Sequence, residues 1–129
     1  MSGFSGVQDS ESFIADAAIT QYAAVVQVTS AEDHCNLPAG ANSALFLGFA
    51  KDAIASGSAG PIIVSGKAKA KLGATTALGD FLMINGSDGS LKPLVLGASN
   101  QYVVAKALRG GSSGDVIPVQ IMQFIAQGA

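Results

Sequence analysis

Residues 50–64 read AKDAIASGSAGPIIV, and residues 105–119 read AKALRGGSSGDVIPV. Each stretch runs from a strand of small residues through a turn rich in glycine and serine into a strand of β-branched residues, which is the pattern of a β-hairpin. The two copies lie about 55 positions apart, and two copies are too few for a solenoid or a propeller. The pair therefore predicts a duplicated β-scaffold.

Short apolar or alternating segments, separated by turn residues, fill most of the remaining chain. Expected strands are 23–29, 44–50, 61–65, 67–72, 81–84, 91–96, 101–108 and 116–121. Residues 31–42 are expected to form a loop or a helical turn, and residues 85–90 a hairpin loop. Pro93 cannot donate to a ladder, so its strand must be short or lie at an edge. About eight short strands with an internal pseudo-repeat predict an all-β fold, a small barrel or sandwich.

Residues 1–20 are rich in glycine and serine and show no regular period. We expect an extended N-terminal arm here, and the β-barrel or sandwich domain over residues 21–129. The arm ends either in a short helical turn over residues 12–18 or is a first, irregular strand. An arm of this kind gains little by ordering alone but can bury apolar side chains against a neighbour or add a strand to it. The apolar side chains expected to make this contact are Phe4, Val7, Phe13 and Ile14.

The composition limits the class of protein. A chain of 129 residues is one domain on length. Only 12% of its residues are charged and 49% are hydrophobic, so much of the surface must be small and neutral or covered by a partner. The net charge is −2 without a basic cluster, which argues against a nucleic-acid partner.

The chain carries one cysteine, Cys35, so an internal disulfide is excluded and folding needs no oxidising compartment. The first residues lack the charged and apolar segments of a secretory signal. No stretch approaches the roughly 18 apolar residues that cross a bilayer. We therefore expect synthesis in the cytoplasm and no membrane partner.

Candidate catalytic and ligand-binding residues have simpler structural explanations. Residues 60–67 differ from a phosphate-binding loop in glycine spacing and in having Ala68 after the lysine. His34 and Cys35 could form part of a metal site or a nucleophilic pair, but they are the only residues of their kinds, and a structural zinc site needs about four ligands. We expect a solvated turn there, and no catalytic residue, metal or cofactor.

Three aspartates in turns are expected to bond to the backbone. Residues 85–90 contain part of the oxygen pattern of a calcium loop but lack its final glutamate. Asp80 and Asp115 each follow a glycine just before a strand, where a carboxylate accepts backbone N–H bonds. These residues are predicted to stabilise turns rather than catalyse a reaction.

Residues 67–72 alternate strictly between lysine and apolar side chains, which is the period of a strand with one buried face. The lysines on the other face are Lys67, Lys69 and Lys71. They form either a solvated face that protects an edge strand from aggregation or a docking stripe for an acidic surface.

The order of strands and turns resembles that of phage capsid cement, or decoration, proteins. The segments that carry the resemblance are 48–52, 60–66, 67–70, 78–82, 88–89, 104–108 and 114–119. The resemblance implies a β-rich structural protein of the virion, made in the host cytoplasm. Such a protein binds the outer surface of the head, commonly as a homotrimer, and stabilises the shell by bridging major capsid protein subunits. It has no cofactor and no enzymatic turnover.

Other functions remain open from the sequence. A head-fibre or tail-associated β-module would bind a host receptor. A small β-barrel hydrolase would use His34 with Asp33 or Cys35, and a ligand-binding barrel would need an enclosed apolar cavity with a few polar groups.

Overall fold

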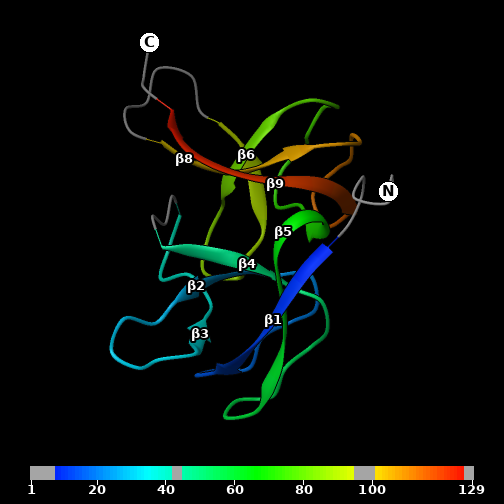
Figure 1. Ribbon diagram of the computed structural model, residues 1–129. Helices are drawn as coiled ribbons and strands as arrows, with labels where there is room; N and C mark the ends of the chain where they lie inside the picture. The colour runs from blue at the N-terminus through cyan, green and yellow to red at the C-terminus, as the bar shows by residue number, and fades with distance from the viewer. Residues whose placement is uncertain (1–7, 42–44, 95–100, 127–129) are drawn as a thin grey trace, which may run out of the picture.

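The computed structural model describes residues 8–41, 45–94 and 101–126, and these residues form nine β-strands and no helix (Figure 1). The strands are β1 (Gln8–Ala15), β2 (Ala24–Gln27), β3 (His34–Asn36), β4 (Phe46–Ala50), β5 (Ala59–Lys71), β6 (Phe81–Ile84), β7 (Leu91–Pro93), β8 (Gln101–Ala107) and β9 (Val116–Ala126). Within these ranges no helix is long and apolar enough to cross a membrane. The predicted all-β class is confirmed.

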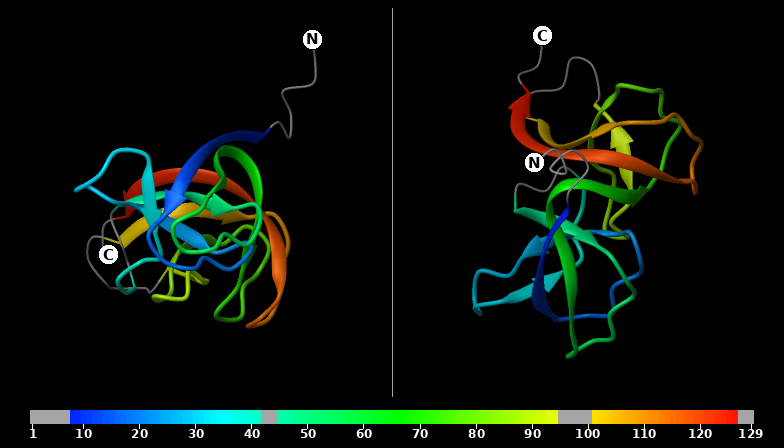
Figure 2. Two further views of the ribbon diagram at one scale, coloured as in Figure 1. Left: turned by 90° about the horizontal axis from the view of Figure 1, so that it is seen from below. Right: turned by 45° about the vertical axis from the view of Figure 1, so that its right-hand side comes forward.

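The strands close into two five-stranded barrels that share β5. The first has the order β1-β3-β2-β4-β5, and β1 closes it by pairing in parallel with β3 and antiparallel with β5. The second has the order β5-β9-β8-β6-β7, and a parallel bridge between Leu72 and Leu91 closes it. Figure 1 shows the first barrel below and the second above, and the right-hand view of Figure 2 shows the same division.

The shared strand β5 has 13 residues and passes from one barrel into the other. Its first half pairs with β1 and β4, and Lys67–Lys71 pair with β9. Gly66 lies between the two halves with a φ of 87°, a left-handed conformation that glycine adopts without steric cost. The sequence analysis treated residues 61–65 and 67–72 as two strands, whereas they are one.

The two barrels are copies related by a shift of 57 residues. Ile19 and Ile54 form a bridge with two backbone hydrogen bonds of 2.9 Å, and Thr76 and Gly111 form the same bridge with bonds of 2.8 and 2.9 Å. Strands β2 and β6 have the same relation in the chain, as do β3 and β7. The predicted pseudo-repeat is confirmed, and hydrogen-bond partners refine its spacing from about 55 to 57 residues.

Two apolar cores follow from the alternation of side chains across the shared wall of β2, β4 and β5. Val25 and Ile62 point into the first barrel, whereas their neighbours Val26 and Ile63 belong to the second core. That second core fills the second barrel and also covers the outer face of the first. Phe46 and Phe49 pack edge to face within it, with ring centroids 5.1 Å apart.

The segment predicted as an arm contributes a strand. Residues 8–15 form β1, so the alternative of an irregular first strand is the one that the structure shows, and no helical turn forms over residues 12–18. β1 lacks a strong apolar pattern because most of its side chains are exposed, and its pairing with β5 stabilises it instead. Residues 1–7 lie outside the described part. The loop expected over residues 31–42 likewise contains β3.

Gly48 lies where β4 and β5 come closest. A Cβ added there would lie 2.2 Å from the carbonyl oxygen of Ile63 and 2.8 Å from Cγ2 of Ile62. The corresponding position of the second barrel is Ala105, which is fully buried. The first barrel therefore needs glycine at a position where the second accepts a methyl group.

We expect Gly48→Ala to lower the free energy of unfolding by about 1–3 kcal/mol, the usual cost of overpacking a core. Urea denaturation followed by circular dichroism measures this. Gly40→Ala is the matched control, because nothing lies within 4 Å of a Cβ at that position; its effect should stay within about 0.5 kcal/mol. Equal effects of the two substitutions would contradict the packing argument.

Candidate interaction surfaces

His34 and Cys35 do not form a reactive pair. Because they are neighbours on β3, their side chains point to opposite faces. Cys35 is fully buried in the first core, and burial, followed by the charge of Asp16, raises the pKa of its thiol. His34 lies at the surface, with Nδ1 2.5 Å from Oδ1 of Asp16. The residues on which the hydrolase alternative depended are thus separated.

Aspartates in the turns bond to the backbone as expected. Oδ2 of Asp80 accepts the N–H of Ala77 at 2.9 Å, and Oδ2 of Asp115 accepts the N–H of Ser112 at 2.8 Å. Each carboxylate holds the turn that precedes its own strand. The predicted structural role of Asp80 and Asp115 is confirmed.

The hairpin loop over residues 85–90 is closed by Asp88. Its Oδ1 accepts the N–H of Ser90 at 3.0 Å and the Oγ–H of Ser90 at 2.7 Å, and these bonds lower the pKa of the Asp88 carboxyl. Among the described residues, no three histidine, cysteine or acidic side chains lie close enough to hold a metal ion. The oxygen atoms of Asp88 therefore serve the turn.

The predicted lysine stripe is present on β5. Lys67, Lys69 and Lys71 are exposed, and the intervening Ala68 and Ala70 are buried, so the predicted alternation is confirmed. Lys69 also borders a hollow of about 240 Å³ in which residues of both halves of β5 meet β4 and the turn before β2. The hollow is lined by Gln21, Tyr22, Ala50, Lys51, Asp52, Ile63 and Lys69.

Tyr22, on the wall of this hollow, has a strained backbone. Its φ is 69°, and the corresponding residue of the second barrel is Gly79, with a φ of 88°. A side chain in this left-handed region costs roughly 1–2 kcal/mol, and such strain is concentrated at functional sites. The first barrel keeps a tyrosine where glycine would relieve the strain, which marks Tyr22 as a candidate contact residue.

The other predicted contact residues lie near the lysine stripe or outside the described part. Phe4 and Val7 are not described. Phe13 and Ile14 are half-buried on β1, and Phe13 packs against the first core. At the opposite end of β1, Gln8 pairs with Gly66, the residue before Lys67. The structure thus brings the start of β1 beside the start of the lysine stripe.

A second surface lies on β6, β8 and β9 of the second barrel. We call Phe81, Lys106 and Phe124 the aromatic face. The rings of Phe81 and Phe124 pack edge to face with centroids 5.3 Å apart, yet they remain 41% and 43% exposed. Nζ of Lys106 lies 5.9 Å from the centroid of the Phe81 ring. The sequence analysis missed this face, although the apolar run 81–84 indicated burial on both sides of β6.

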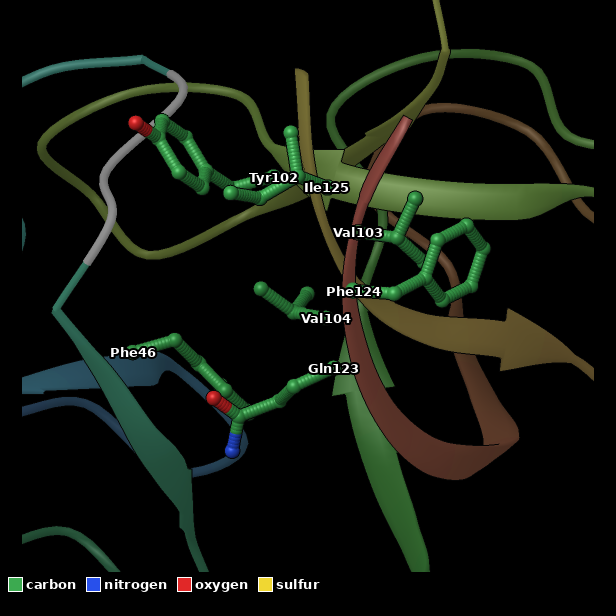
Figure 3. Close-up of a pocket in the computed structure, with 7 residues that line it drawn as sticks. All are labelled: Phe46, Tyr102, Val103, Val104, Gln123, Phe124 and Ile125. Carbon is green, nitrogen blue, oxygen red and sulfur yellow. The ribbon is translucent and has the colours of Figure 1, made fainter. Parts of the chain in front are cut away.

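β9 separates the aromatic face from a groove of about 230 Å³ (Figure 3). Phe124 and Val103 point to one side of β9 in Figure 3, whereas Gln123 and Ile125 point to the other side, toward Phe46. The distal half of β9 thus presents apolar side chains on both faces.

No family model matches the chain, and no curated protein matches its sequence. Among solved structures, it is similar to the head fiber gp8.5 N base of bacteriophage phi29, with a TM-score of 0.68 over 94% of this chain and 99% of that chain. The two sequences are 16% identical. At this level of identity the comparison shows a shared fold.

We expect Tyr22→Gly to be more stable than Tyr22→Ala by about 0.5–1 kcal/mol. Both variants lose the ring, but only glycine adopts the positive φ without steric cost, and its greater freedom in the unfolded chain offsets part of the gain. Thermal and urea denaturation measure the difference. Gly79→Ala should lose a similar amount, because a Cβ there has open space and only the backbone is strained. Equal stability of the two Tyr22 variants would show that position 22 is unstrained.

The Cys35 thiol should react slowly with iodoacetamide at neutral pH in the folded protein. Burial both shields the sulfur and raises its pKa, so little thiolate is available. Mass spectrometry over time, with and without urea, measures the rate. A folded-state rate equal to that in urea would contradict the burial of Cys35.

Proposed function

We propose that this chain is a structural protein of a phage virion that binds the outer surface of the head. The observation that carries the proposal is the fold, shared over almost the whole chain with a protein described as the base of a phage head fibre. The resemblance of its strands and turns to capsid cement proteins supports the same assignment. In this proposal the partner is the major capsid protein, and the chain stabilises the shell by bridging neighbouring capsid subunits.

The lysine stripe, together with the hollow beside it, is the proposed capsid contact. Lys67, Lys69 and Lys71 present three positive charges on one strand, which suits an acidic surface on the shell. Tyr22 adds an aromatic ring that can be buried at the centre of the contact, where aromatic anchors contribute most. The arm residues Phe4 and Val7 precede β1, whose start lies beside Lys67, and would extend this contact.

A homotrimer is the proposed assembly, and the outer capsid surface its location after synthesis in the host cytoplasm. The small number of charged residues, 12% of the chain, supports an assembly in which copies or capsid subunits cover part of the surface. The free, buried Cys35 is compatible with folding in a reducing compartment.

A second candidate function is the base of a head fibre. The structural match supports it, since the solved protein carries that description. The two functions differ in what is lost with the protein: a cement protein is needed for resistance of the head to heat or chelator, whereas a fibre base is needed for a projecting fibre. Electron microscopy and heat challenge of virions lacking the protein distinguish them.

We expect Lys69→Glu to lower the occupancy of the protein on heads severalfold, because it places a negative charge in the centre of the stripe. Arg109→Glu makes the same change of charge at an exposed turn of the second barrel and should leave occupancy unchanged. Incubation of purified protein with heads that lack it, followed by gel densitometry of sedimented heads, measures occupancy. Equal binding by both variants would contradict the proposed contact.

The contribution of the arm is tested by deletion of residues 2–7. A longer deletion of residues 2–18 would also remove β1 and open the first barrel, so loss of binding would then have a second cause. Removal of Phe4 and Val7 should weaken binding to heads while the thermal unfolding midpoint stays unchanged. Undiminished occupancy would exclude the arm from the contact.

A further inference from the structure

The aromatic face has a counterpart in the first barrel, because the two barrels are copies. Ala24 pairs with Phe49, and Phe49 with Ile63, across β2, β4 and β5. The same pairings shifted by 57 residues join Phe81 to Lys106, and Lys106 to Gln120, across β6, β8 and β9. The two sets occupy the same outer face of their barrels.

These equivalent faces differ in burial. Ala24 and Phe49 are fully buried and Ile63 is 3% exposed, because the second barrel packs against them. Phe81, by contrast, is 41% exposed, and Phe124 on the same face is 43% exposed. The molecule thus contains one covered copy of this face and one uncovered copy with larger aromatic side chains.

The turn between β6 and β7 supplies part of the cover. The carbonyl oxygen of Gly89 accepts the N–H of Ala24 at 2.8 Å, and a Cβ added at Gly89 would lie 2.7 Å from Cβ of Ala23. Backbone contact this close shows that the turn is seated on the start of β2.

The corresponding turn of the first barrel joins β2 to β3 and is exposed. Closing bridges align the two turns: Ala15 pairs with Cys35 as Leu72 pairs with Leu91, so the second turn is one residue shorter. Asp33, with a φ of 60°, therefore corresponds to Gly89, with a φ of 77°. Asp33 and the preceding Glu32 are both exposed and acidic.

The geometry points to a contact between two copies of this chain, in which the turn between β2 and β3 of one copy packs on the aromatic face of the next. The contact repeats between chains the packing that already joins the two barrels within one chain. Glu32 and Asp33 would face Lys106, which stands where the covered face has Phe49, so the charges are complementary.

The contact is head to tail, because it joins two different surfaces. A head-to-tail contact forms a ring if its rotation closes, and otherwise a filament. The inference rests on the proposed homotrimer, in which three copies would close a ring of six barrels. It adds the residues that make the contact.

Mixing two single-cysteine variants tests the pairing of surfaces. Lys106→Cys and Glu32→Cys, carried on chains of different length, are mixed and oxidised, and the products are separated on a gel. We expect a disulfide-linked product that contains one chain of each kind, and little product from either variant alone. Linkage between two Lys106→Cys chains would show a face-to-face contact, and no mixed product would overturn the inference.

Size-exclusion chromatography with light scattering tests the aromatic side chains. We expect the wild type to be a trimer and Phe81→Ser a monomer. Val116→Ser is the matched control: Val116 is 42% exposed, but its counterpart Ala59 is exposed too, so this position should lie outside the contact. A monomeric wild type, or a trimer of Phe81→Ser, would overturn the inference.

A charge exchange gives an independent outcome if Phe81→Ser is poorly folded. Lys106→Glu should dissociate the trimer, and Glu32→Lys in the same chain should restore it. A trimer that survives Lys106→Glu contradicts this interface but leaves the proposed homotrimer intact. Binding to heads is measured separately, so failure of the proposed function is distinguishable from failure of this interface.

Discussion

The structure depends on one strand that belongs to two barrels. β5 pairs with β1 and β4 over its first half and with β9 over its second, and its side chains alternate between the two cores, with Ile62 in one and Ile63 in the other. A slip of one residue would exchange these faces and expose both. The register of β5 therefore holds the barrels in a single arrangement, which a rigid platform requires.

Duplication explains why the halves share hydrogen bonds, and their differences indicate where the molecule has specialised. Gly48 of the first barrel corresponds to Ala105, and this difference concerns packing alone. Tyr22 and Gly79 share a left-handed backbone, but only Tyr22 is strained by it. Phe49 is buried, whereas its counterpart Lys106 lies beside an exposed ring. The last two differences lie at surfaces, and these surfaces are the ones that we propose for the capsid and for a second copy.

Prediction from the sequence succeeded where the structure is local. The hairpin loop at residues 85–90, the short strand at Pro93 and the alternation of lysine and alanine on β5 follow from turn chemistry and the period of a strand. Prediction failed for β1 and β3, which are held by partners far away in the chain. β1 exposes most of its side chains and pairs with residues about 50 positions later, so its own pattern carries little signal.

The sequence by itself determined an all-β chain with a repeated hairpin, one buried face on the lysine strand and carboxylates committed to turns, because each of these depends on neighbouring residues. Only the tertiary structure decided that the repeat forms two closed barrels, that one outer face of the first is buried by the second, and that the equivalent face remains open. Those facts depend on pairing between distant strands and on the area that one barrel covers on the other, which no local pattern encodes.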